Sequence, residues 1–583
     1  MTEGPGSGRG GGRALDDGPG ERSPGPLSRA PPFDDRSLVR WARAGAIALG
    51  VCRAIASRNA SNPAGIAYLD IADAYRRGDL ANAVNAYWSP LYSWLLALAT
   101  LALRPSAYWE AATAHVLNLL IYLGALLAFE KFLGAVMASS RDEPGALPDW
   151  CWIAIGYPMF AWSALVFITV SDLSADLLAS AFMYGAGALL VRHLRRPWSA
   201  AEAIGFGAAL GLAYLSKAGM FPLSIVWLVL ALACRREPRR NLRGVALAAL
   251  VFAVVSAPFI TAMSLQKRRA TYGDAGTLVY AWFVSGVPRY AHWQGEPPGH
   301  GVPVHPDRKL HDHPAVDEYA TPVSGTHPIW YDPTYWHEGL ETRFDARRQV
   351  RALRTAARIQ FEMFMQSQAE IMALILLLGL GAGARRRRLA GTWPLLAAAA
   401  AAIAMFSLVH VEPRFVGGFL VMVLLGSLSI VRLPDDAGRR GLASMIAVSA
   451  GALITVRLVV STAGDLVSRD YGRPHPQYAI ARALEQHGLG AGARVATIGP
   501  GFSSYWARLA RARIVAEVPA GEEGQFWSAS AETRREVLDI FRTAGVKAIV
   551  ATSVPRSDAS EGWKPLAGGE AWAFFLDEPR IRR

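Results

Sequence analysis

Long apolar runs separated by short polar turns dominate the chain. A helix that crosses a bilayer needs roughly 17–25 mostly apolar residues. Such runs occupy 41–57, 111–131, 150–170, 174–192, 201–216, 219–234, 244–263, 369–384, 393–410, 413–431 and 441–461. One further run, 89–103, is shorter and begins with Ser89-Pro90. The pattern predicts a mainly α-helical fold, a polytopic transmembrane bundle.

Clusters of basic residues orient these runs, because short cytoplasmic loops carry an excess of Arg and Lys. Four clusters stand around Arg192, Arg235, Arg385 and Arg432, and each consecutive pair brackets two runs. All four clusters and the N-terminus can therefore be cytoplasmic together, provided that one of the five runs before Arg192 does not cross. The shortest, 89–103, is expected to be a re-entrant or interface helix, which leaves about eleven spans.

This topology divides the chain into three parts. Residues 1–36 are rich in Gly, Pro, Ser and Arg and are expected to form a disordered cytoplasmic N-terminus. Residues 37–463 form the transmembrane domain, with two large outward loops at 58–110 and 264–368. Residues 464–583 form an extracytoplasmic tail.

The tail has the pattern of a small α/β domain. Two apolar segments, 494–499 and 546–550, are predicted to be buried strands, and 532–543 is an amphipathic helix between them. This order suggests βαβ crossovers. Gly499-Pro-Gly501 marks a tight turn after the first strand, but it lacks the full dinucleotide glycine pattern. No nucleotide cofactor is predicted.

Composition agrees with a membrane protein. Of 583 residues, 52% are hydrophobic and 18% charged, and the mean hydropathy is +0.20, which leaves too little charge for a soluble surface. A net charge of +13 would suggest nucleic acid in a soluble protein. Here the basic residues stand between apolar runs and no nucleic-acid-binding motif occurs, so we expect membrane lipids as partners and no nucleic acid.

Four acidic residues are candidates for chemistry on the outer side. Asp70 and Asp73 lie three residues apart in the first outward loop, so a helix would place them on one face. Asp172 and Asp176 lie in a tight turn that the topology places on the same side. Carboxylates at a span boundary are costly unless they are solvated or used. The alternative is an amphipathic helix on the membrane and a solvated turn.

Two cations stand at outer span ends, Lys217 and Arg414. Both suit a phosphate held near the lipid headgroups, and Arg can bind it through two hydrogen bonds. Snorkelling toward lipid phosphates explains each of them equally well.

The loop 264–368 is rich in histidine and aromatic residues. Its histidines are His292, His300, His305, His311, His313, His327 and His337. His311-Asp312-His313 is a candidate metal contact, but no helix-spaced His pair with a third carboxylate occurs, so no metal site is predicted. Its Trp and Tyr residues suit sugar stacking and membrane interfaces equally.

Together these features resemble the C-type (GT-C) polytopic glycosyltransferases, a superfamily that includes bacterial protein O-mannosyltransferases and the lipid A aminoarabinose transferase. The resemblance covers most of 40–430 in organisation, and the order and sidedness of the motifs are more specific than any single motif. The matching motifs are Tyr68-Leu-Asp70-Ile-Ala-Asp73 before Gly78-Asp79, Trp88-Ser-Pro90-Leu-Tyr92, the turn with Asp172 and Asp176, Ser216-Lys217-Ala-Gly219, and Glu412-Pro-Arg414-Phe415.

The resemblance implies sugar transfer at the outer, periplasmic face of a bacterial inner membrane. The donor would be a polyprenyl-phosphate-linked sugar, and the acceptor a glycan, lipid or protein. Asp70 is the first choice for the carboxylate that acts as general base or positions the acceptor, within a catalytic set that also includes Asp73, Asp172 and Asp176. Lys217 and Arg414 would stabilise the departing lipid phosphate. The resemblance implies that no nucleotide is needed, and it is compatible with a divalent metal.

One position departs from the superfamily. Aligning on Tyr68 puts Ala64 where such enzymes usually have an acidic residue. This favours a second hypothesis, a non-catalytic protein that binds a lipid carrier or a glycan partner on the same scaffold. A transporter is less well supported, because inverted repeats and correspondingly broken spans are not evident.

Overall fold

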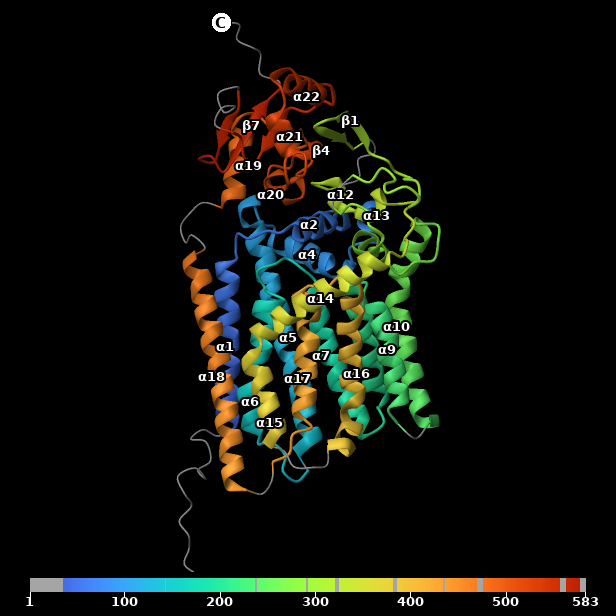
Figure 1. The fold of residues 1–583 in the computed structure, drawn as a ribbon, viewed down its shortest axis with the longest axis vertical. Helices are drawn as coiled ribbons and strands as arrows, with labels where there is room; N and C mark the ends of the chain where they lie inside the picture. The colour runs from blue at the N-terminus through green and yellow to red at the C-terminus, as the bar shows by residue number, and fades with distance from the viewer. Residues whose placement is uncertain are drawn as a thin grey trace, which may run out of the picture.

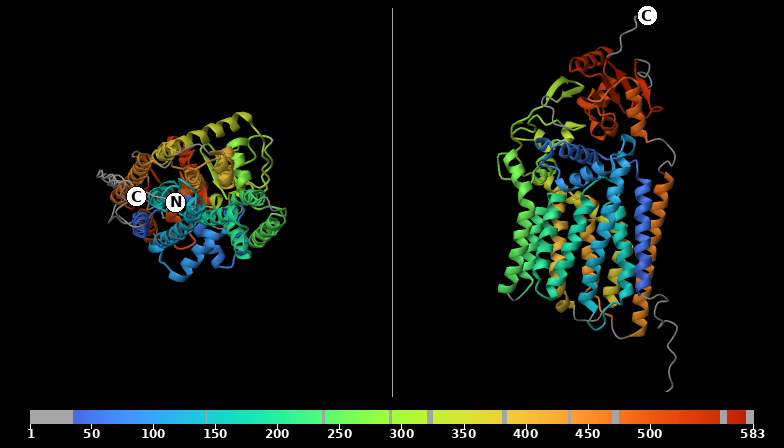
Figure 2. Two further views of the ribbon diagram at one scale, coloured as in Figure 1. Left: turned by 90° about the horizontal axis from the view of Figure 1, so that it is seen from below. Right: turned by 180° about the vertical axis from the view of Figure 1, so that it is seen from behind.

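The computed structural model describes residues 35–141, 143–235, 238–289, 292–319, 325–380, 385–433, 436–468, 475–555 and 562–576. The predicted disordered N-terminus lies outside these ranges except for its last two residues. Upright helices form a bundle, and one end of the bundle carries crossing helices and a small sheet (Figures 1 and 2). The mainly helical fold with a small C-terminal sheet is thereby confirmed.

The bundle contains helices from both halves of the chain. They are α1 (Asp35–Ala56), α5 (Glu110–Arg141), α6 (Asp149–Trp162), α7 (Asp176–Arg195), α8 (Ala200–Ser216), α9 (Met220–Ala233), α10 (Pro238–Gln266), α15 (Gln368–Leu380), α16 (Arg385–Val409), α17 (Pro413–Leu428) and α18 (Ala437–Ser468). Among the described residues, 6 helices are long and apolar enough to cross a membrane, or 7 if α14 (Ala346–Gln366) and α15, bent by 78°, are one span. The count of about eleven spans stays a prediction.

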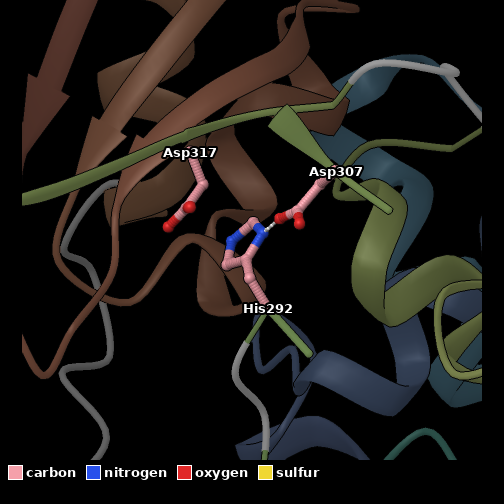
Figure 3. A group of neighbouring side chains, drawn as sticks. All are labelled: His292, Asp307 and Asp317. Atoms are coloured by element: carbon pink, nitrogen blue, oxygen red, sulfur yellow. Dashed lines mark hydrogen bonds and ion pairs between the residues drawn. The ribbon is translucent and has the colours of Figure 1, made fainter. Parts of the chain in front are cut away.

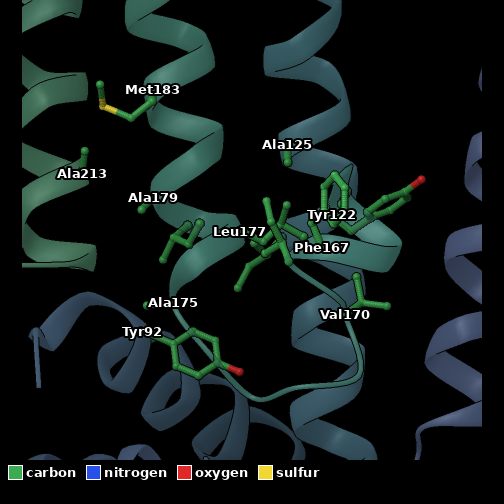
Figure 4. Packing of buried hydrophobic residues seen from close by; sticks show 14 of the residues in the cluster. Tyr92, Tyr122, Ala125, Phe167, Val170, Ala175, Leu177, Ala179, Met183 and Ala213 are labelled. Carbon is green, nitrogen blue, oxygen red and sulfur yellow. The ribbon is translucent and has the colours of Figure 1, made fainter. Parts of the chain in front are cut away.

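Aromatic and small residues pack the interior of the bundle. Figure 4 shows buried side chains of α5, α7 and the π-helical turn η2 (Ser163–Phe167) meeting beside Tyr92. Phe129 stacks on Phe160 with ring centroids 4.8 Å apart. Small residues allow close approach elsewhere: a Cβ at Gly207 of α8 would lie 2.2 Å from the carbonyl oxygen of Ala248 in α10.

Two helices lie across the end of the bundle below the sheet: α2 (Pro63–Arg76) and α4 (Pro90–Leu103) (Figure 1). Both begin with proline, which suits the first turn of a helix because its missing N–H would have no partner there. Tyr68 of α2 packs edge-on against Tyr92, with ring centroids 5.0 Å apart, and the Ser93 hydroxyl donates to the Tyr68 carbonyl at 3.0 Å. The run 89–103 thus forms a short helix that lies across the end of the bundle.

The sheet joins two distant segments of the chain. Its strand order is β1-β2-β4-β3-β5-β7-β6. The strands are β1 (Arg308–Asp312), β2 (Ala315–Glu318), β3 (Arg494–Ile498), β4 (Arg513–Val518), β5 (Ala548–Ala551), β6 (Lys564–Leu566) and β7 (Ala571–Phe575). In the tail, β3 is parallel to β4 and to β5. The predicted helix is α22 (Ala531–Thr543), but it follows β4, a strand that the sequence pattern did not predict, and leads to β5.

The sequence did not predict the contribution of the loop 264–368 to this sheet. Its hairpin β1–β2 extends the tail sheet, because β2 pairs antiparallel with β4 and places Asp317 opposite Glu517. The short helices α12 (Pro328–Tyr331) and α13 (Pro333–Trp336) follow the hairpin and lie between the sheet and α2 (Figure 1). The loop and the tail therefore form one cap over the end of the bundle.

Candidate active site

A cavity of about 470 Å³ lies between the cap and the bundle. This volume is in the range of small-molecule binding sites. One wall comes from α2 and the segment before α4, and the others come from the turns that precede α7, α9 and α17 and from residues within 272–289. Aromatic side chains make up much of the lining: Tyr68, Tyr87, Trp88, Tyr272, Trp282, Phe283, Trp330, Phe406 and Phe415.

Asp176, Lys217 and Arg414 meet in this cavity. Asp176 is the first residue of α7, and its 6% exposed side chain forms an ion pair with the ammonium of Lys217. A guanidinium nitrogen of Arg414 lies 3.7 Å from the second carboxylate oxygen of Asp176. The Lys217 ammonium also stands 3.4 Å from the ring centroid of Phe415, a cation–π contact. Burial lowers the pKa of Lys217, although the charge of Asp176 opposes this shift.

A second carboxylate, Glu412, organises the neighbouring cations. It accepts a hydrogen bond of 2.6 Å from Arg414 Nε, and its other oxygen lies 3.0 Å from His410 Nε2. Burial favours the neutral acid, but His410 and Arg414 together lower the pKa of Glu412 to about 2. Arg289 also lines the cavity, with its guanidinium 4.9 Å from the ring centroid of Phe283. Three cationic side chains and two carboxylates therefore face one space, which suits an anion.

Asp172 lies beside the cavity lining in the turn before α7. Its backbone carbonyl accepts a hydrogen bond of 2.9 Å from Asn118, and its half-buried side chain interacts electrostatically with Arg414. The same turn is tied to the start of α2, because the Leu173 amide donates to the Asn62 side chain at 3.1 Å. The predicted acidic turn thus places Asp176 in the cavity and Asp172 behind it.

Asp70 and Asp73 lie on the face of α2 that points away from the cavity. Ala64 and Tyr68, four residues apart, share the face that lines the cavity. Asp70 is two residues beyond Tyr68, about 200° around a helix of 3.6 residues per turn, and therefore faces the cap. The sequence correctly put both carboxylates on one face, but that face does not line the cavity with Asp176. Ala64, the unusual position, does line it.

The cap supplies the partners of Asp70 and one partner of Asp73, which also accepts a hydrogen bond of 3.1 Å from Arg76 in α2. Arg508, in α20 (Tyr505–Leu509), donates to Asp70 at 2.6 Å and to Asp73 at 2.8 Å. The same guanidinium makes two bonds of 2.8 Å to Glu110. Thr326 adds its amide and hydroxyl to Asp70 at 2.7 and 3.0 Å. Burial raises the pKa of Asp70, and the charge of Arg508 works against that shift.

Sequence reasoning missed several of these residues. Arg289 and Phe283 lie in the long outward loop, and no local pattern connects them with Lys217. Arg508 carried a weak signal, because it stands between apolar residues in Tyr505-Trp-Ala-Arg508-Leu509 and a buried Arg requires an acidic partner. The candidate metal contact at His311 is not assembled: its Nδ1 lies 2.8 Å from the Pro314 carbonyl oxygen.

A helical bundle with two helices across one end and an α/β cap defines the architectural class, and solved C-type glycosyltransferases share this fold, so the resemblance seen in the sequence is confirmed at the level of fold. The chain is similar to ArnT from Cupriavidus metallidurans in the apo state, with 14% identity, a TM-score of 0.53, and 92% of this chain and 98% of that chain covered. The structure of ArnT bound to undecaprenyl phosphate matches with 12% identity, a TM-score of 0.53, and 92% and 97% covered. No family model and no curated protein sequence matches this chain.

Proposed function

We propose that this protein is a glycosyltransferase of the bacterial inner membrane that moves a sugar from a polyprenyl-phosphate donor to an acceptor at the periplasmic face. The observation that carries this proposal is the meeting of Asp176, Lys217 and Arg414 in an aromatic cavity at one end of a helical bundle. The basic clusters in the sequence favour a periplasmic position for this end of the bundle and a cytoplasmic N-terminus. About eleven spans would then lie between the N-terminus and the tail.

Lys217 and Arg414 bind the phosphate of the donor in this mechanism. The acceptor oxygen or nitrogen forms a bond to the sugar carbon while the bond between that carbon and the phosphate oxygen breaks, and the phosphate leaves with the electron pair. Cations that are already positioned stabilise the charge that develops on the leaving group. Aromatic walls such as Trp88 and Trp282 provide flat apolar faces against which a sugar ring can stack.

Asp176 accepts the proton of the acceptor hydroxyl or amine. In the structure it is neutralised by Lys217 and lies close to Arg414, and a carboxylate with two cations is a weak base. A donor phosphate competes for these cations and so releases Asp176 as the donor binds. Asp172 supports Arg414 from behind, whereas Asp70 and Asp73 hold the cap through Arg508.

Binding of the lipid phosphate tests the cationic half of the proposal. Undecaprenyl phosphate is titrated into the purified full-length protein in detergent, and the affinity is followed by native mass spectrometry. Lys217→Met should weaken binding by at least about 30-fold, because a buried charge contact costs 2 kcal/mol or more. The matched control is Lys131→Met, at an exposed lysine of α5 outside the cavity. Equal affinities of all three proteins would remove Lys217 from the phosphate site.

Turnover separates the enzyme from a non-catalytic lipid binder. Membranes that contain the protein are supplied with polyprenyl-phosphate hexoses and pentoses and with envelope extract as acceptor, and the release of free polyprenyl phosphate is measured. We expect release from at least one donor, above membranes without the protein. A protein that binds undecaprenyl phosphate but releases none from any donor is the non-catalytic alternative, which the alanine at position 64 favours.

A further inference from the structure

A second polar cluster lies in the cap, outside the cavity. His292 and Asp307 come from the long loop, and Asp317 comes from β2. One ring nitrogen or carboxylate oxygen of each residue lies within 4.8 Å of the others, and all three residues are buried. Figure 3 shows the two carboxylates on either side of the imidazole ring. The cluster therefore has a nitrogen and two oxygens directed at one small volume.

Asp317 is the unusual member. Its side chain is buried, with 4% of the residue exposed, yet its carboxylate has no hydrogen bond and no ion pair to any described residue. A buried carboxylate without a partner is strongly unfavourable, so this position requires a cation or a proton.

Both ring nitrogens of His292 face carboxylates: Nδ1 is in close contact with Asp307, and a bound metal ion would replace this contact. The Nε2 of His292 lies 2.8 Å from Glu517, whose second carboxylate oxygen lies 3.0 Å from His327 Nε2. A Glu517 oxygen thus lies behind the distal ring nitrogen of His292, where it can accept from Nε2–H and leave Nδ1 to a metal ion. A carboxylate behind the distal nitrogen is the common arrangement of a metal-binding histidine.

We propose that His292 Nδ1, Asp307 and Asp317 bind a divalent transition-metal ion within the loop, beside its junction with the tail sheet. Two carboxylates neutralise a dication, and one imidazole with two carboxylates suits Zn²⁺ or Mn²⁺. Through Glu517 of β4 the ion is coupled to the tail sheet, and through Asp317 to the hairpin that extends it. The role is structural, because these residues do not line the cavity.

Metal content of the intact protein tests this site. Full-length protein in detergent is stripped with a chelator and titrated with Zn²⁺, and the bound metal is measured by mass spectrometry after desalting and by calorimetry. We expect one high-affinity Zn²⁺ per chain. Asp317→Asn and Asp307→Asn should each weaken binding by about 100-fold or more, since loss of even an outer-shell partner costs 10–100-fold.

The matched control is Asp312→Asn. Asp312 lies in the same hairpin at the end of β1, but its side chain is 80% exposed and pairs with Lys309. This variant should keep the wild-type affinity. The proposal is overturned if wild-type protein takes up no stoichiometric Zn²⁺ or Mn²⁺, or if Asp317→Asn and Asp307→Asn bind as wild type does. Either result would make the cluster a protonated hydrogen-bond network. The wild-type titration decides the question even if a variant does not fold.

Discussion

Two charge clusters lie on opposite faces of α2 and differ in how their partners are shared. In the cap, the guanidinium of Arg508 serves Asp70, Asp73 and Glu110, and the Arg508 side chain is only 8% exposed. In the cavity, Asp176 is shared between Lys217 and Arg414, whose side chains are 22% and 25% exposed.

The difference separates a docking cluster from a binding cluster. All three guanidinium nitrogens of Arg508 already donate to carboxylates, and the surplus charge there is negative, so an anion is repelled. The cavity has more cations than carboxylates and enough space for a ligand. A phosphate can replace Asp176 as the partner of Lys217 without leaving a cation buried and unpaired. We infer that one face of α2 lines the reaction site and the other holds the cap.

Two substitutions, Asp176→Asn and Asp70→Asn, should show the largest difference between the two clusters. Removal of a general base should lower the rate of polyprenyl phosphate release by about 10²- to 10⁴-fold in Asp176→Asn. Binding of undecaprenyl phosphate should persist, because Lys217 and Arg414 are retained. Asp70→Asn should keep the rate within about tenfold, since it does not touch the cavity. The measurement is initial release rate at saturating donor.

The reverse outcome is equally informative. If Asp70→Asn loses turnover and Asp176→Asn keeps it, the base lies on the cap side of α2, as the sequence alone suggested. Melting temperatures of both variants control for folding. A loss that follows the melting temperature in either variant would not count as catalytic.

Arg508→Met should have the next largest effect, on stability. It leaves Asp70 and Glu110 without their cation and Asp73 with Arg76 alone, and breaking a buried pair costs about 3–5 kcal/mol. We expect a lower midpoint of cap unfolding and faster proteolysis of the tail, for example within α19 (Pro476–Gln486). The control Arg482→Gln removes an exposed pair with Glu485 and should cost no more than about 1 kcal/mol. Equal protease resistance in both variants would contradict docking through Arg508.

The sequence could predict the cavity cluster because each member stands at a helix end. Asp176 begins α7, Lys217 follows α8, and Arg414 is the second residue of α17. The basic clusters assign the other ends of these helices to the cytoplasmic side. The three residues are therefore expected at the same, outer side of the membrane. The same counting of charged loops indicated a non-crossing segment at 89–103, where the short helix α4 lies across the bundle.

Contacts between residues of distant segments could not be predicted from the sequence. Asp70 points away from the cavity because its partner Arg508 is 438 residues distant, and no local pattern connects the two. The hairpin β1–β2 lies in a segment rich in Gly and Pro, which hides strand alternation, and its edge pairing with β4 depends on the folded tail. The cluster around His292 is invisible for the same reason, since Glu517 is supplied by that distant strand.

The smallest expected effect is a pH dependence carried by Lys217. Burial lowers its pKa below the ordinary 10.5, so the ammonium loses its proton earlier as pH rises. A neutral amine does not attract phosphate, so undecaprenyl phosphate binding should weaken as pH rises from 7 toward 10.5. Burial raises the pKa of Tyr68, which therefore stays neutral in this window. In Lys217→Arg the guanidinium remains charged, so the alkaline loss should disappear while affinity at pH 7 falls by less than about tenfold. A wild-type affinity that is constant up to pH 10 would show that Lys217 keeps its proton through the pair with Asp176.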